Sequence, residues 1–223
     1  MIDQLIIGDR ASFDDFGASL STRVIGQPKK KSIRETVPYS NKTYDFSAID
    51  GEVYWEDREL EYSFEMTAPT PEKLEDMKIA FSSWIMNIFE DEIHDPFIPE
   101  YHFKGTFEEI DFEDDEGLDK TTAKVKFTAY PYKIANHKRV FEGEVPTGMA
   151  GSLLIINESS HPVTPTINSE KILYLRLNGK NYTAGIGETY DETLKLPVGV
   201  YEISVSTDEM GGKFSISFYE EVF

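Results

Sequence analysis

Alternating hydrophobic and polar positions dominate the chain and predict short β-strands. In the segment 60–66 the apolar side chains occupy every second position: Leu60, Tyr62, Phe64 and Met66. This period of two is typical of a strand that buries one face. Val53 and Trp55, in the preceding segment, follow the same alternation. The first third of the chain is therefore predicted to consist of strands separated by turns.

One segment changes to the period of an α-helix. Its apolar residues recur three or four positions apart: Leu74, Met77, Phe81, Trp84, Ile85, Ile88 and Phe89. Thr70 can accept a hydrogen bond from the first turn, and Pro71 suits the first helical position. We predict a helix from Pro71 to Phe89 whose apolar stripe packs on the strands. A cofactor groove along this stripe is the less favoured interpretation.

A long β-hairpin is predicted after the helix, and a second domain follows it. The segments 101–112 and 120–132 flank an acid-rich turn, and the strands beyond residue 150 alternate cleanly, with Asn178-Gly179 as a hairpin turn. The predicted fold class is mainly β. We expect an N-terminal β-sandwich or barrel with one α-helix and the hairpin (α+β) in 1–142, then a small antiparallel β-sandwich in 143–223.

Net charge narrows the possible functions. The chain has 22 basic and 41 acidic residues, a formal charge of -19 at pH 7. Such a protein repels nucleic acid, so we do not expect a nucleic-acid reader. The longest apolar run is far shorter than the roughly 20 residues of a membrane-spanning helix, so we expect no membrane insertion. The absence of cysteine excludes disulfides and thiol chemistry.

Motifs that carry chemistry are few. The four histidines share no metal-ligand spacing. A calcium loop starting at Asp111 would need Gly at its sixth position and Glu at its twelfth, but Glu116 and Thr122 stand there. No serine-hydrolase, phosphate-loop or dinucleotide-binding motif occurs. We therefore expect no enzyme activity, no cofactor and no metal site.

Positive charge is densest in the segment 25–47, "IGQPKKKSIRETVPYSNKTYDFS". We interpret it as a long loop, because turn-forming residues bound it and no apolar face is sustained. The candidate inter-subunit contacts are its bases and the acids of the hairpin: Lys29, Lys30, Lys31, Arg34, Glu108, Glu109, Asp111, Glu113, Asp114, Asp115 and Glu116. Between two copies of the chain that meet head to tail, these surfaces of opposite charge would be complementary. A solvated basic loop is the alternative.

Two segments, "VPYSNKTYDFSAIDGEVYWEDRELEYSFEM" and "KVKFTAYPYKIA", lie before and after the predicted helix. Together with that helix, they make the first 140 residues resemble the N-terminal domain of siphophage distal tail proteins (Dit). The matching residues are Val37, Pro38, Tyr44, Asp45, Ser47, Tyr54, Asp57, Arg58, Pro131 and Tyr132. Tyr39 departs from the family's usual glycine. "NESSHPVTPTI" and "LPVGVYEISVS" are similar to segments of the family's galectin-like C-terminal β-sandwich.

The resemblance implies a structural protein of a bacteriophage or prophage tail. Dit proteins form a ring, usually hexameric, that joins the tail tube protein to the tail-tip hub (tail-associated lysin) protein and to a receptor-binding protein. DNA passes through the ring without specific binding. The implied location is the virion tail tip, after assembly in the host bacterial cytoplasm. The alternatives are a carbohydrate-binding module that recognises host surface glycans and a hydrolase of the cell envelope.

Overall fold

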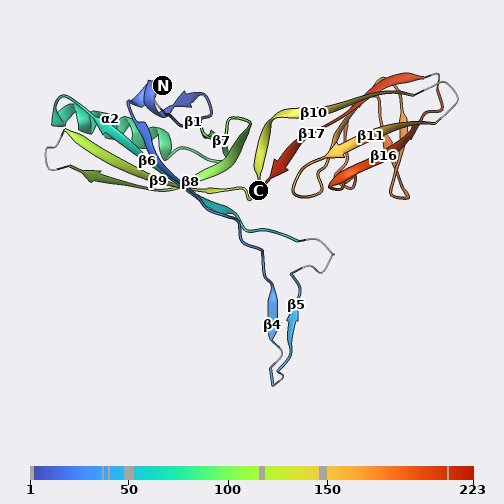
Figure 1. Cartoon of the computed structure of the whole chain (residues 1–223), viewed down its shortest axis with the longest axis horizontal. Helices are drawn as coiled ribbons and strands as arrows, with labels where there is room; N and C mark the ends of the chain where they lie inside the picture. The colour runs from blue at the N-terminus through green and yellow to red at the C-terminus, as the bar shows by residue number, and fades with distance from the viewer. Residues whose placement is uncertain are drawn as a thin grey trace. The chain divides into compact units, whose positions relative to one another are not determined.

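The computed structural model describes residues 3–36, 38–39, 41–47, 53–115, 119–145, 150–209 and 211–223. The fold is mainly β, which confirms the predicted fold class (Figure 1). The chain divides into two compact units. Unit 1 comprises Met1–Lys133 with Phe223, and unit 2 comprises Ile134–Val222. Neither of the helices in the described ranges is long and apolar enough to cross a membrane.

Unit 1 is built on an antiparallel sheet. Its main run has the strand order β3-β6-β9-β8, and β7, β1 and β2 continue from β8. The strands are β1 (Ile6–Ile7), β2 (Arg10–Ala11), β3 (Ser19–Ile25), β6 (Arg58–Thr67), β7 (Asp91–His94), β8 (Tyr101–Asp114) and β9 (Lys120–Ala129). β8 and β9 form the predicted long hairpin, with a register shift between Phe107 and Glu109.

Two helices accompany this sheet: α1 (Ser12–Phe16) and α2 (Pro71–Ile85). The Thr70 side chain accepts a hydrogen bond from the Lys73 amide, so the predicted N-terminus of α2 is confirmed. The predicted C-terminus at Phe89 is wrong, because α2 ends at Ile85. The chain turns after it, and Glu90 adopts a left-handed φ of 56°. The helical spacing of apolar residues predicted a longer helix because Ile88 is buried, but Ile88 lies in the turn after α2.

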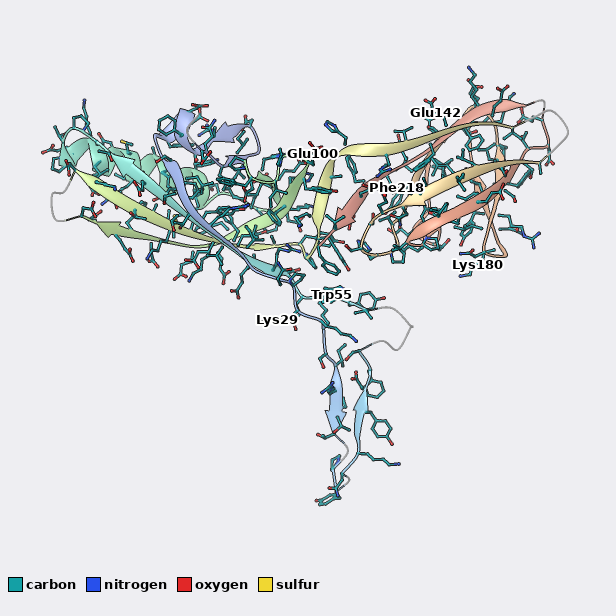
Figure 2. The ribbon with its side chains drawn as sticks, in the orientation of Figure 1. Lys29, Trp55, Glu100, Glu142, Lys180 and Phe218 are labelled. Carbon is teal, nitrogen blue, oxygen red and sulfur yellow. The ribbon has the colours of Figure 1, made fainter. Side chains whose placement is uncertain are left out.

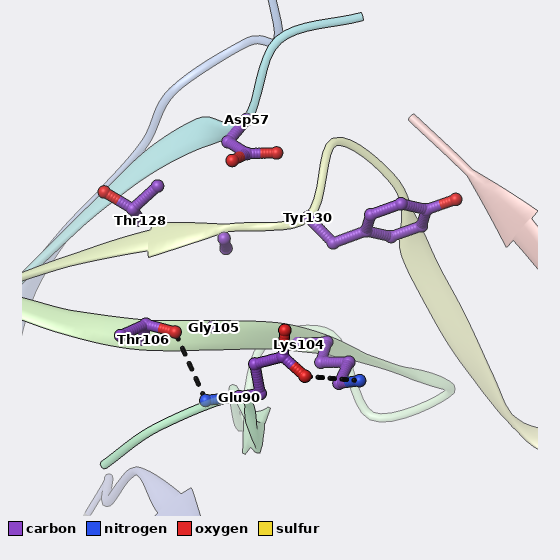
Figure 3. Close-up of a pocket in the computed structure, with 8 residues that line it drawn as sticks. Asp57, Glu90, Lys104, Gly105, Thr106, Thr128 and Tyr130 are labelled. Carbon is purple, nitrogen blue, oxygen red and sulfur yellow. Dashed lines mark hydrogen bonds and ion pairs between the residues drawn. The ribbon is translucent and has the colours of Figure 1, made fainter. Parts of the chain in front are cut away.

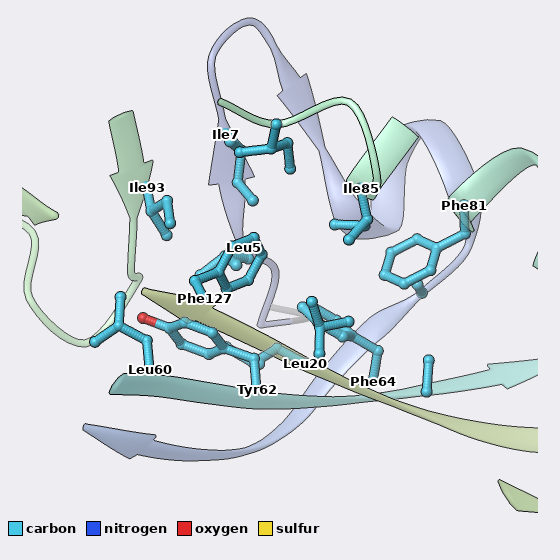
Figure 4. Close-up of a cluster of buried hydrophobic side chains, with 14 of the residues drawn as sticks. Leu5, Ile7, Leu20, Leu60, Tyr62, Phe64, Phe81, Ile85, Ile93 and Phe127 are labelled. Atoms are coloured by element: carbon cyan, nitrogen blue, oxygen red, sulfur yellow. The ribbon is translucent and has the colours of Figure 1, made fainter. Parts of the chain in front are cut away.

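The core of unit 1 lies between the sheet and α2. The alternating residues of β6 are all buried, as the sequence predicted, and they pack with apolar residues of α2, β1, β7 and β9 (Figure 4). Aromatic side chains meet edge to face, with the rings of Phe64 and Phe81 5.2 Å apart. The apolar stripe of α2 is therefore part of the core, as expected from its spacing.

The segment predicted to be a long loop contains a β-hairpin. β4 (Arg34–Thr36) and β5 (Thr43–Asp45) pair as a separate two-stranded sheet. Tyr39 turns the chain with a φ of 65°, a left-handed conformation that favours glycine. The loop interpretation was wrong because short strands with both faces exposed leave no hydrophobic alternation. We call residues 26–57, which contain this hairpin, the arm.

Unit 2 consists of two antiparallel sheets that bury one apolar core, the predicted β-sandwich. One has the order β11-β16-β13-β14, and the other β10-β17-β12-β15. The strands are β10 (Lys133–Val145), β11 (Gly151–Asn157), β12 (Thr166–Ser169), β13 (Leu173–Leu177), β14 (Lys180–Ala184), β15 (Gly187–Tyr190), β16 (Gly199–Ser206) and β17 (Gly212–Val222). Asn178 and Gly179, with φ of 49° and 80°, form the predicted turn.

Candidate functional site

The arm begins as an extension of the β3–β6 ladder. The Gly26 amide donates to the Glu59 carbonyl at 2.8 Å, and the ladder continues through Lys29 and Glu56 to Lys31 and Tyr54. Figure 2 shows Lys29 and Trp55 on the two paired segments where the arm joins unit 1. The backbone pairing therefore holds the three consecutive lysines on an ordered ribbon. Their side chains remain exposed.

Hydrogen bonds around Asp45 close the hairpin of the arm. Its carboxylate accepts from the Ser47 amide at 2.9 Å and from Arg34 Nε at 3.3 Å. The Ser47 hydroxyl accepts from the Ile33 amide at 2.9 Å. Hydrogen bonds from the side chain and amide of Ser47, followed by the charge of Arg34, lower the pKa of Asp45 to about 2. Asp45, Ser47 and Arg34 thus stabilise the β4–β5 pair locally.

The arm also exposes large apolar side chains. The relative exposures run from 40% to 108% for Ile33, Tyr39, Tyr44, Phe46, Val53 and Tyr54. The rings of Tyr44 and Phe46 stack on each other with centroids 6.3 Å apart. Isolated exposed apolar residues are normal, but several on one short segment mark an interaction surface. The arm therefore combines an apolar surface with a cluster of cations.

The acids of the β8–β9 hairpin have partners within their own chain. Glu113 accepts from Lys124 at 2.6 Å and Glu109 from Lys126 at 2.7 Å, and each carboxylate raises the pKa of its lysine. Glu108 accepts from the Thr128 hydroxyl at 3.0 Å. Asp111 and Asp115 are exposed, and Glu116 lies outside the described residues. Contact between these acids and the arm of another subunit stays a prediction.

Asp114 connects the tip of the hairpin to α2. Its carboxylate lies 2.6 Å from Lys78 Nζ, and the same ammonium is 2.8 Å from Glu75. Lys78 and the Thr121 hydroxyl lower the pKa of Asp114. The buried Lys78 also sits over the ring of Phe112 on β8, 5.7 Å from its centroid. The hairpin tip and the first turns of α2 therefore form one continuous acidic surface.

The exposed face of the β6–β9–β8 sheet carries rows of opposite charge. Lys126 stands between Glu61 on β6 and Glu109 on β8. Lys124 stands between Ser63 and Asp111 in the next row. Lysines on the central strand thus offset part of the charge of the acids on either side. The sequence alone showed these acids but not the strand that neutralises them.

The side of α2 that faces away from the core exposes apolar side chains that the sequence patterns did not predict. Ile79 and Met86 lie seven residues apart and hence on the same side of α2, and their exposures are 63% and 60%. Phe89, which the helical spacing assigned to the core stripe, is 75% exposed just beyond the helix. That assignment was wrong because α2 ends four residues earlier. The seven-residue spacing of Ile79 and Met86 was the available signal.

Arg58 and Tyr132, two residues that carry the family resemblance, make packing and hydrogen-bond contacts within unit 1. Arg58 is buried and donates to the Pro131 carbonyl, and its guanidinium lies 5.5 Å from the ring centroid of Phe103. Burial lowers its pKa. Tyr132 packs on Phe223, whose ring also meets Trp55 at 4.7 Å. The resemblance residues here therefore hold the base of the arm.

Asp57 lines a shallow pocket together with Glu90, Lys104 and Thr106. Glu90 and Lys104 form an ion pair at 3.2 Å, and Thr106 Oγ1 accepts from the Glu90 amide (Figure 3). Glu90 and Lys104 neutralise each other here, and Asp57 contributes an exposed carboxylate. Within the described ranges, no group of three or more His, Asp or Glu could hold a metal ion.

The fold of the chain is similar to that of a solved phage distal tail protein. The solved structure of the Dit (gp 19.1) protein of SPP1, described as a hub adsorption apparatus in phages that infect Gram-positive bacteria, matches 98% of this chain and 99% of its own, with a TM-score of 0.66 and 13% identity. The activated baseplate of phage P2 is a weaker match, at TM-score 0.40 and 10% identity over 97% of this chain and 98% of its own. No protein-family model and no curated protein sequence matches. The predicted resemblance to Dit is confirmed at the level of the fold.

Proposed function

We propose that this protein is a structural component of a phage tail tip, and that it forms a ring there. The observation that carries the proposal is the Dit fold, which extends over nearly the whole chain. The ring joins the tail tube protein to the hub (tail-associated lysin) protein and to a receptor-binding protein. The role requires no catalysis. The chain assembles in the bacterial cytoplasm and remains at the virion tail tip.

An exposed sheet edge supports ring formation. In the described part of unit 1, β6 is the one strand that pairs with β3. The Leu20 amide donates to the Asp3 carbonyl near the start of β3, and Val24 further along this edge strand is 61% exposed. Open edges promote uncontrolled pairing unless another strand covers them. A closed ring of identical subunits covers every such edge with the same contact. We infer that six copies close the ring.

The charges of unit 1 support both assembly and DNA passage. Lys29, Lys30 and Lys31 of one subunit would meet the acids of the β8–β9 hairpin on its neighbour, a contact that steers association more than it adds affinity. The internal pairs of Glu109, Glu113 and Asp114 restrict this contact to the rest of the hairpin acids. A net acidic lining would repel DNA and let it pass without specific binding.

Oligomeric mass is the direct test of the ring. The purified chain is measured by light scattering and imaged by negative stain at low and high salt. A closed ring of about six times the 25.4 kDa subunit supports the proposal. Exchange of the three arm lysines for glutamate should slow ring closure, and reversal of hairpin acids should partly restore it. A strict monomer at high protein concentration would count against the ring.

We also propose that 1–142 and 143–223 are separate domains. The two compact units support a two-domain chain, although β10 runs through Glu142 and is hydrogen-bonded to β17. Part of the predicted boundary region, 146–149, lies outside the described residues. Fragments 134–223 and 143–223 separate the possibilities. Cooperative unfolding of both supports the boundary after residue 142, and cooperative unfolding of the longer one alone places it at the start of β10.

A further inference from the structure

We propose that the exposed face of α2 is the docking site for the arm of a second copy of this chain. The inference rests on the proposed ring and names the surfaces that form one of its contacts. Both surfaces belong to unit 1, and both expose apolar side chains. One of them carries acids, and the other carries the three consecutive lysines, Lys29, Lys30 and Lys31.

The receiving surface is an apolar strip with acids along it. Ile79 and Met86 form the strip on the side of α2 away from the buried Leu74, Phe81 and Ile85. Glu72, Glu75 and Asp76 occupy the same exposed side, one or two turns before Ile79. Through the ion pairs of Lys78, this side continues into the acidic tip of the β8–β9 hairpin.

The docking surface is the arm. Its stacked Tyr44 and Phe46 are apolar groups that would bury area on a partner, and Ile33 lies on the facing chain. The three lysines at the root supply the positive charge that the α2 face lacks. Apolar contacts at the centre with complementary charges at the rim are the usual composition of a specific interface.

A second copy fits both surfaces better than an unrelated protein does. Each subunit has one arm and one α2 face, so a head-to-tail contact uses every arm and every face once and closes without a remainder. The net charge of -19 makes identical subunits repel one another unless opposite charges are brought together locally. Residues 29–34 of the arm carry the densest positive charge of the chain, and the α2 face and hairpin tip are acidic.

Cysteine cross-linking tests this contact, because the natural chain contains no cysteine. Tyr44→Cys and Ile79→Cys are made in separate proteins, which are mixed and treated with a short bismaleimide. A Tyr44→Cys and Ile172→Cys mixture is the matched control, since Ile172 is 41% exposed and lies in unit 2. Circular dichroism confirms that each variant is folded, and light scattering records ring formation in the same samples.

We expect several-fold more cross-linked dimer from the Tyr44→Cys and Ile79→Cys mixture than from the control. The combined substitutions Lys29→Glu, Lys30→Glu and Lys31→Glu in the Tyr44→Cys protein should reduce the yield of cross-linked dimer. Glu72→Lys and Asp76→Lys in the Ile79→Cys protein should restore this yield. Rings without this cross-link would overturn the docking site while leaving the ring intact, and would indicate that another tail protein covers α2. Loss of both ring and cross-link would overturn both, and efficient cross-linking of Ile79→Cys to itself would replace the arm with a symmetric α2 contact.

Discussion

Replacement of Asp95 by alanine is expected to destabilise unit 1 by about 3 kcal/mol. Asp95 is buried, and its carboxylate accepts from Arg23 at 2.7 Å, from the Phe97 amide at 2.9 Å and from the Tyr62 hydroxyl at 3.4 Å. The guanidinium of Arg23 also stacks on the Phe97 ring, 4.6 Å from its centroid. One carboxylate thus connects β3, β6 and the loop after β7.

The magnitude follows from what the substitution leaves behind. Removal of one partner of a buried ion pair typically costs about 3 to 5 kcal/mol. Arg23 has a side-chain exposure of 32%, so it can recover hydration, which favours the lower end. The Tyr62 hydroxyl cannot, and an unsatisfied buried donor costs about 1 to 3 kcal/mol. Burial, followed by the negative charge of Asp95, raises the pKa of Tyr62, so this hydroxyl stays a donor throughout the neutral range.

Urea unfolding followed by tryptophan fluorescence measures this loss in unit 1 alone. Both tryptophans, Trp55 and Trp84, belong to unit 1. Trp84 stacks on Phe16 at 4.6 Å and reports the core. A Trp55→Phe background leaves Trp84 as the single emitter. The midpoint and slope of the transition then give the change in unfolding free energy.

Two further variants separate the network from a general effect of substitution. Asp95→Asn keeps an acceptor for the Phe97 amide and should lose less stability than Asp95→Ala. In a double-mutant cycle, Tyr62→Phe should cost less in the alanine background than in the natural chain. Glu100→Ala, at an exposed site, is the matched control and should stay within about 0.5 kcal/mol. A loss below about 0.5 kcal/mol for Asp95→Ala, or strict additivity with Tyr62→Phe, would refute the reasoning.

Three other substitutions test local features. Gly143→Ala should destabilise unit 2 by about 1 to 3 kcal/mol in thermal unfolding, because the added Cβ would lie 2.6 Å from the Phe214 ring, and an unchanged midpoint would disprove this overlap. Thr70→Ala should cost unit 1 about 0.5 to 2 kcal/mol by removing the cap of α2, whereas Thr70→Ser should retain most of it. NMR titration of Asp45 should give a pKa near 2, which Ser47→Ala raises towards 3.8. Because folding lowers this pKa, the contribution of Asp45 to the hairpin is complete above about pH 4 and is lost as the pH falls through 2; a natural pKa near 3.8 would contradict the hydrogen bonds.

Features with a local cause could be predicted from the sequence. The buried face of β6 was evident from alternation, because a strand that covers a core must place apolar groups at every second position. Thr70 and the Asn178-Gly179 pair marked a helix start and a hairpin turn through chemistry confined to a few neighbouring residues. The family resemblance combined such local features, and the fold confirmed it.

The candidate contacts depended on tertiary pairing that local patterns do not encode. The acids Glu109 and Glu113 were visible in the sequence, but only the register of β8 against β9 placed Lys126 and Lys124 beside them. The pairing of β4 with β5 likewise left no periodic signal, because neither strand of the arm covers a core.

Alternation and turn residues are enough to predict which segments of this protein bury an apolar face and where several of them turn. Which charged and apolar groups remain exposed depends on how those segments pack in three dimensions. Exposure of Ile79 and Met86, for example, depends on which side of α2 the sheet covers, and partners far along the chain set that side. Burial is a collective property of packed elements, whereas hydrophobic periodicity belongs to one element alone.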